Sequence, residues 1–154
     1  MNPDEHSLGQ RPVAIALCGL VVILALVVGV GLASNLVVRH IVQTLPLWFG
    51  VALGFRRARA TGWVALPFFL FWLALMVIIW LYLLGIVRII SGHFSPVEIA
   101  MTIIVGAASL TGIVMFVGFR SLFSPAKAAT AFVAMALLQW ACFRISFLPA
   151  IAHR

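Results

Sequence analysis

The fold is decided by residues Trp63–Val87, which read WVALPFFLFWLALMVIIWLYLLGIV. This stretch contains no charged side chain, and it exceeds the roughly 18 apolar residues that mark a helix able to cross a membrane. At about 1.5 Å per residue it can span a hydrocarbon core of about 30 Å with some tilt. We therefore predict a transmembrane helix at about residues 63–87.

The composition of the whole chain agrees with this interpretation. Of the 154 residues, 65% are hydrophobic and 8% are charged, whereas soluble domains are roughly 45–50% apolar and 25% charged. Polar residues are too few to cover the exterior of a water-soluble domain, and that class is excluded. We predict an all-α fold, an integral membrane helical bundle that forms a single domain over residues 1–154.

Two later helices begin at matching sequence signals. Ser95-Pro96 and Ser124-Pro125 each place a serine N-cap before a proline at the first helical position. Glu98 completes a capping box with Ser95. The sequence predicts spans at about residues 96–119 and 126–148, and Pro149 is expected to stop the second of them.

The apolar region that precedes Trp63 is too long for one span. Ser34-Asn35 offers a turn in its middle, so we expect spans at about residues 13–33 and 36–55, which makes five in all. An alternative treats residues 45–60 as an interfacial helix, apolar at first and rich in arginine at its end, and leaves four spans.

Helical spacing in the second segment favours five spans. Its polar and small residues recur every three or four positions, which places them on one face: Arg39, Gln43, Pro46, Gly50 and Gly54. A helix with one such face packs it against protein and turns the remainder toward lipid.

The net charge of +7 carries information about orientation. Three arginines lie between the second and third apolar segments: Arg56, Arg57 and Arg59. By the positive-inside rule, loops 56–62 and 120–127 are cytoplasmic, and loop 88–95 and the C-terminus face outward. We expect a multi-pass protein of a cell membrane, of the bacterial inner-membrane type, with membrane lipids as partners and no nucleic acid.

No enzyme motif is present in the sequence. The three acidic residues are Asp4, Glu5 and Glu98, so one chain cannot place a pair of carboxylates within the membrane for acid/base chemistry. The two cysteines follow no metal or redox spacing. We expect no enzymatic activity, no cofactor and no resident metal.

Folding the five-span arrangement brings seven polar residues to a similar depth at the outer face: Arg39, His40, Arg88, His93, Glu98, Arg144 and His153. In the simplest interpretation the basic side chains are solvated at the headgroup level, and Glu98 caps its own helix. Alternatively, Glu98 pairs with Arg39 or Arg144 and leaves a basic surplus that binds anionic lipid headgroups or a small anion. A third interpretation has the three histidines bind Zn²⁺.

Small and polar residues within the spans are candidates for helix packing, because they permit close backbone approach or hydrogen bonding between helices. The candidates are Gly50, Gly54, Gly106, Ser109, Gly112 and Gln139.

The leading functional expectation is a small polytopic membrane protein without enzymatic activity. It would act as a subunit or assembly partner of a larger complex, or as a homo-oligomer. The alternative is a transporter or channel for a small anionic or amphipathic solute that uses the arginines at the outer mouth. A third possibility is an enzyme that modifies membrane lipids.

Overall fold

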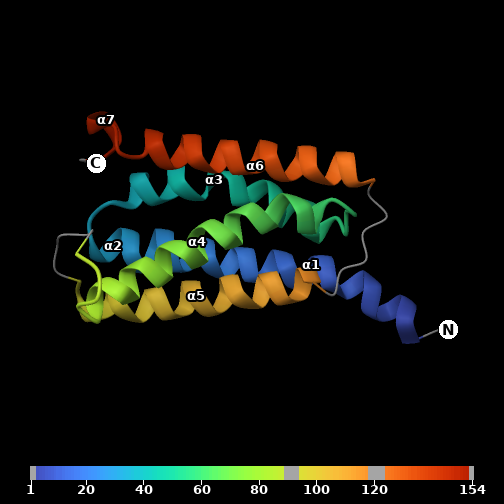
Figure 1. Ribbon diagram of the computed structural model, residues 1–154, viewed down its shortest axis with the longest axis horizontal. Coiled ribbons are helices and arrows are strands. Elements are labelled where there is room, and N and C mark those ends of the chain that lie inside the picture. Colours follow the sequence, from blue (N-terminus) through green and yellow to red (C-terminus); the bar gives the residue numbers. More distant parts are fainter. Residues whose placement is uncertain (1–2, 89–93, 118–123, 153–154) are drawn as a thin grey trace.

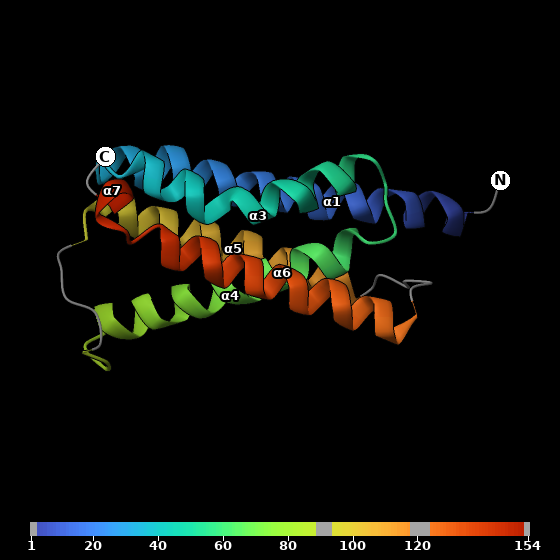
Figure 2. The same cartoon turned by 90° about the horizontal axis from the view of Figure 1, so that it is seen from above.

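The computed structural model describes residues 3–88, 94–117 and 124–152. Within them, five helices are long and apolar enough to cross a membrane: Gln10–Ala33, Val37–Phe55, Thr61–Leu83, Pro96–Val117 and Pro125–Ile145. They run up and down beside one another, and the N-terminal helix extends beyond the others at one end (Figure 1, Figure 2). The predicted all-α membrane bundle with five spans is confirmed.

The first span consists of three labelled parts, α1 (Pro3–Leu24), η1 (Ala25–Val30) and α2 (Gly31–Ala33). The segment η1 is a π-helical turn, in which each N–H bonds to the carbonyl five residues earlier. A turn at Asn35, whose φ of 59° is left-handed, then reverses the chain. Asparagine tolerates this conformation better than most residues, and the predicted turn at Ser34-Asn35 is therefore confirmed.

The second span, α3 (Val37–Phe55), is one continuous helix. It excludes the alternative in which residues 45–60 form a separate interfacial helix. Four of the five residues predicted to share its packed face are buried: Gln43, Pro46, Gly50 and Gly54.

The third span, α4 (Thr61–Leu83), ends earlier than the predicted Val87. Gly85 has a φ of 75°, a left-handed conformation that commonly terminates helices. The apolar composition continues past this residue, and for this reason hydropathy alone placed the end of the helix too late.

The last two spans are α5 (Pro96–Val117) and α6 (Pro125–Ile145). Both begin at the predicted proline, and Ser124 Oγ accepts a hydrogen bond from the Lys127 N–H at 3.5 Å. The predicted end of α5 at residue 119 lies outside the described residues. The predicted end of α6 at residue 148 was wrong, because the helix stops at Ile145 and Pro149 opens a further short helix, α7 (Pro149–Ala152).

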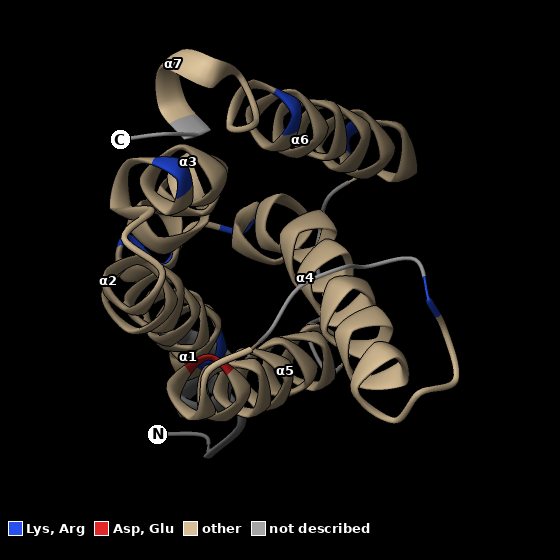
Figure 3. Ribbon diagram, turned by 90° about the vertical axis from the view of Figure 1, so that its left-hand side faces the viewer, with Lys and Arg blue, Asp and Glu red and all other residues tan. Residues whose placement is uncertain are grey.

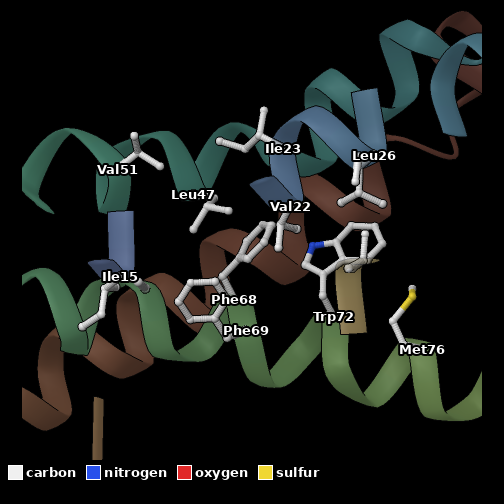
Figure 4. Close-up of a cluster of buried hydrophobic side chains, with 13 residues drawn as sticks. Ile15, Val22, Ile23, Leu26, Leu47, Val51, Phe68, Phe69, Trp72 and Met76 are labelled. Atoms are coloured by element: carbon white, nitrogen blue, oxygen red, sulfur yellow. The ribbon is translucent and has the colours of Figure 1, made fainter. Parts of the chain in front are cut away.

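The apolar core is formed by the first four spans (Figure 4). Val22 from α1, Leu47 from α3, Phe68 and Phe69 from α4 and Val105 from α5 are each at most 2% exposed. The helix α6 packs against α3 and α4, outside this core, and is the least buried of the five spans.

Three of the predicted packing glycines mark close approaches between helices. A Cβ added at Gly54 would lie 2.5 Å from Ala16 Cβ and 2.6 Å from the Pro12 carbonyl oxygen, and one at Gly112 would lie 2.5 Å from the Phe69 ring. At Gly50 the corresponding distance, to Ala65 Cβ, is 3.2 Å.

Gly106 and Ser109, also on the list of predicted packing residues, differ from these three. A Cβ added at Gly106 would lie 3.8 Å from Met76 Cβ, an ordinary contact, so no close helix approach depends on this glycine. Ser109 is fully buried on α5, and in the part of the chain that the structure describes its hydroxyl oxygen has no hydrogen-bond partner. Burial of Ser109 therefore serves packing without an interhelical hydrogen bond.

Candidate functional site

A partly open cavity of about 280 Å³ lies at the end of the bundle where α3 and α5 begin and α4 and α6 end. We call this the cavity end; Figure 3 looks onto it and shows the helices arranged in a ring. All five spans contribute to the cavity. Its polar lining residues are Ser34, Arg39, His40, Gln43, Glu98 and Thr102, and its other walls are apolar or aromatic.

His40 enters the cavity lining because α3 begins directly after the Asn35 turn. The side chain is 8% exposed, and its Nδ1 lies 2.9 Å from the Leu36 carbonyl oxygen. A carbonyl oxygen only accepts hydrogen bonds, so we assign the proton to Nδ1 as the donor. In the neutral imidazole, Nε2 is then an acceptor.

Arg39 connects the start of α3 to the end of α6. Its guanidinium carbon lies 4.0 Å from the centre of the Phe147 ring, within the range of a cation–π interaction. Its Nε is buried and has no hydrogen-bond partner among the described residues. The side chain forms no ion pair with a carboxylate in the part of the chain that the structure describes.

Glu98 caps the helix on which it lies. Its Oε2 accepts a hydrogen bond from the Ser95 N–H at 2.7 Å, while Ser95 Oγ accepts one from the Glu98 N–H at 3.2 Å. This is the predicted capping box. Within the described ranges Glu98 forms no ion pair with Arg39 or Arg144, so the geometry supports the capping interpretation over the salt-bridge interpretation.

The structure brings together only part of the predicted outer-face cluster. Arg39, His40 and Glu98 line one cavity, whereas Arg88 and Arg144 are exposed and lie outside its lining. His93 and His153 lie outside the described residues. Among the residues that are described, no group of three potential metal ligands occurs, and the zinc interpretation remains untested.

A buried hydrogen-bond network supports one wall of the cavity. Gln43 Nε2 donates to Ser146 Oγ at 2.9 Å, and Gln139 Nε2 donates to the Gln43 carbonyl oxygen at 3.3 Å. Ser146 Oγ in turn donates to the Phe143 carbonyl oxygen at 2.6 Å. The network joins α3 to α6. The sequence predicted Gln139 as a packing residue but did not pair it with Gln43. The missed signal was that Gln43 and Gln139 each interrupt an apolar segment, so that each needs a buried partner.

Apolar core side chains lie directly below the lining residues of the cavity. One helical turn deeper than the lining residues Leu26, Gln43 and Trp72, the same three helices contribute fully packed core side chains. These are Val22, Leu47 and Phe68. The apolar core, which includes the lining residues Leu26, Trp72 and Met76, thus lies against the cavity (Figure 4).

The arrangement combines one guanidinium, one carboxylate and one imidazole acceptor with apolar walls. Such a combination suits the binding of a molecule that has a polar head and an apolar part. No family model, curated protein or solved structure matches this chain. The functional argument therefore depends on the geometry of the cavity.

Proposed function

We propose that the protein is a non-enzymatic polytopic membrane protein that binds a small amphipathic molecule at the cavity end. The observation that carries the proposal is the cavity itself: all five spans contribute to its walls, and its polar side chains come from Ser34, α3 and α5. Polar and charged side chains within membrane spans are energetically costly, and they commonly mark ligand or ion sites.

Binding is favoured over conduction because packed side chains close the cavity on its inner side. Val22, Leu47 and Phe68, each at most 2% exposed, are apolar core side chains one helical turn below the lining residues. Binding is also favoured over catalysis, since Glu98 is the only carboxylate among the lining residues and already caps a helix. General acid–base catalysis by two carboxylates has no second member here.

We also propose that the membrane is of the bacterial inner-membrane type, with the arginine-rich 56–62 loop in the cytoplasm. The support for this orientation is the position of Arg56, Arg57 and Arg59 between two spans. The cavity end would then face outward.

Photo-crosslinking tests the binding proposal. Purified protein in nanodiscs is exposed to lysophospholipids that carry a diazirine near the head group, with ethanolamine, choline or glycerol heads. We expect at least one probe to label cavity residues such as Leu75 and Met101 saturably, with excess unlabelled lysolipid displacing it. Leu137, exposed on α6, provides the reference for nonspecific labelling from the bilayer.

Two filling variants serve as controls for location. Thr102→Phe and Ser34→Phe each place a ring where the cavity now lies, and each should reduce cavity labelling without reducing labelling of Leu137. Two results would contradict the proposal: labelling that does not saturate with any head group, or labelling of Met101 that persists in both variants.

A second candidate function is that of a subunit or assembly partner in a larger complex, or of a homo-oligomer. The observation that favours it is the helix α6, which buries the smallest share of its surface among the five spans. Its exposed side chains include Val133, Leu137 and Trp140. Co-purification of a membrane protein at fixed stoichiometry in mild detergent would support this candidate, and a purified monomer that retains ligand binding would oppose it.

A further inference from the structure

We infer that the head group bound in the cavity is a zwitterion with an anionic oxygen and a primary ammonium, the chemistry of a phosphoethanolamine ester. This inference rests on the proposed function, because it names the class of molecule that the same cavity would hold. It follows from three lining side chains and from the way they are partnered.

The first side chain is Arg39, which supplies an uncompensated positive charge. Its guanidinium packs on the Phe147 ring, and no carboxylate of the described chain neutralises it. A guanidinium presents several N–H donors that match the oxygens of a phosphate. An anionic oxygen of a ligand is the partner that this group lacks.

The second and third side chains are acceptors. Glu98 uses Oε2 in its helix cap, which leaves Oε1 without a hydrogen-bond donor from the described residues, and His40 uses Nδ1 toward Leu36, which leaves Nε2 as an acceptor. A primary ammonium carries three N–H donors and can serve both acceptors, whereas a quaternary ammonium has none. The two acceptors therefore favour an ethanolamine head over a choline head.

The charges of Arg39 and Glu98 line one cavity but do not pair. They are farther apart than the 4.0 Å that defines an ion pair. An anionic ligand would leave Glu98 facing a like charge, and a cationic ligand would do the same to Arg39. A zwitterion offers an opposite charge to both Arg39 and Glu98. The two-carbon arm of phosphoethanolamine separates its charges more widely than the single carbon of an α-amino acid.

The volume of the cavity limits how much of the ligand it encloses. At about 280 Å³ it lies just below the roughly 300–1,000 Å³ of pockets that bury drug-sized molecules. It suits a head group and the first part of an apolar chain. A membrane phosphatidylethanolamine and a soluble phosphoethanolamine ester both carry this chemistry.

Native mass spectrometry of detergent-purified protein separates the possibilities. Phosphatidylethanolamine, phosphatidylcholine and phosphatidylglycerol with identical acyl chains are added singly and in competition. We expect one retained phosphatidylethanolamine per chain, preferred about tenfold over the other two lipids, because a hydrogen bond to a charged group commonly supports a difference of that size. Soluble glycerophosphoethanolamine forms a separate arm, and displacement of the lipid by it at comparable concentration identifies a free solute as the ligand.

Three variants assign the preference to residues. Glu98→Gln retains a capping side chain but removes the negative charge, and it should abolish the preference for phosphatidylethanolamine over phosphatidylglycerol. Arg39→Met retains the apolar stem and should reduce retention of both lipids about tenfold. Arg144→Gln is the matched control, because it removes an exposed arginine near the end of α6, outside the cavity lining. It should change neither the lipid preference nor the amount of lipid retained.

The outcomes separate this inference from the proposed function. Saturable retention of a lipid with no preference for ethanolamine, or a preference that survives Glu98→Gln, overturns the inference and leaves the binding function intact. An effect of Arg144→Gln equal to that of Arg39→Met also overturns the inference, since the loss would then reflect overall charge. Failure of every probe to bind, here and in photo-crosslinking, overturns the proposed function as well.

Discussion

Glu98 shows how one side chain can serve a local and a distant purpose. One of its oxygens closes the capping box with Ser95 at the start of α5, and the side chain also lines the cavity opposite Arg39. The first role needs a hydrogen-bond acceptor, whereas the second needs a negative charge. Substitution by glutamine separates the two.

We expect Glu98→Gln to change the free energy of unfolding by less than about 0.5 kcal/mol, because glutamine also serves a capping box and no ion pair is lost. Ser95→Ala removes the N-cap hydroxyl and should cost about 1 kcal/mol. Denaturant titration in detergent micelles, followed by circular dichroism, measures both. A loss of several kcal/mol in Glu98→Gln would instead indicate a desolvated cation that had depended on this carboxylate.

At the residue scale, the sequence predicted those features that depend on residues close together in the chain. The capping box and the Asn35 turn involve residues within a few positions of one another. The bond from Gln43 to Ser146 joins residues 103 positions apart. Its formation depends on how α3 and α6 rotate about their axes, and hydropathy carries no information on that rotation.

At the scale of single helices, glycines determine how closely two neighbouring helices can approach. The helices α1 and α3 approach closely at Gly54, where the neighbouring atoms include the Pro12 backbone carbonyl. A backbone atom cannot move aside as a flexible side chain can. Contact at Gly106 is ordinary, and the two glycines therefore form a matched pair for experiment.

We expect Gly54→Ala to destabilise the protein by about 1–3 kcal/mol, the usual cost of overpacking. Gly106→Ala should be neutral or stabilising by up to about 1 kcal/mol, because alanine favours the helix and its methyl group fits. Thermal unfolding of the two variants under identical detergent conditions provides the comparison. Equal losses of stability would refute the assignment of Gly54 as a site of close approach.

The helix ends differ in how well the sequence predicts them. The starts of α5 and α6 follow from serine and proline in fixed positions, and both were correct. The end of α4 was misplaced because the chain stays apolar beyond Gly85, although its backbone has already left the helix. An apolar side chain is favourable in lipid whether or not its backbone is helical. Hydropathy therefore overestimates the length of a span.

For the whole molecule, the odd number of candidate spans in the described residues predicts that the two chain ends lie on opposite sides of the membrane. The number of spans was predictable because each crossing requires a minimum length of apolar helix. The cavity was not predictable, since it arises from the relative rotation and tilt of five helices. Of the five predicted outer-face residues that the structure describes, three line it.

Reporter fusions test this topology. We expect a reporter fused to Met1 to remain cytoplasmic and one fused to Arg154 to be exported, because the arginines of the 56–62 loop fix the orientation. The measurement is the activity of an enzyme that functions only on one side of the membrane. Export of both reporters would mean an even number of crossings and would remove α3 from the set of spans.

The π-helical turn η1 has a consequence for chain length. A π turn holds one more residue than a regular helical turn needs, so the first span contains a surplus residue between two regular segments.

Deleting Val28, which is half exposed, should convert η1 to regular helix and preserve the phase of both flanks. Deleting Leu137 from the regular helix α6 should rotate the remainder by about 100° and move Gln139 and Ser146 off their buried face. Monodispersity on size exclusion compares the two deletions, and equal damage from both would show that the surplus residue is not expendable. We therefore expect the first span to tolerate the gain or loss of one residue at η1 without repacking of the bundle.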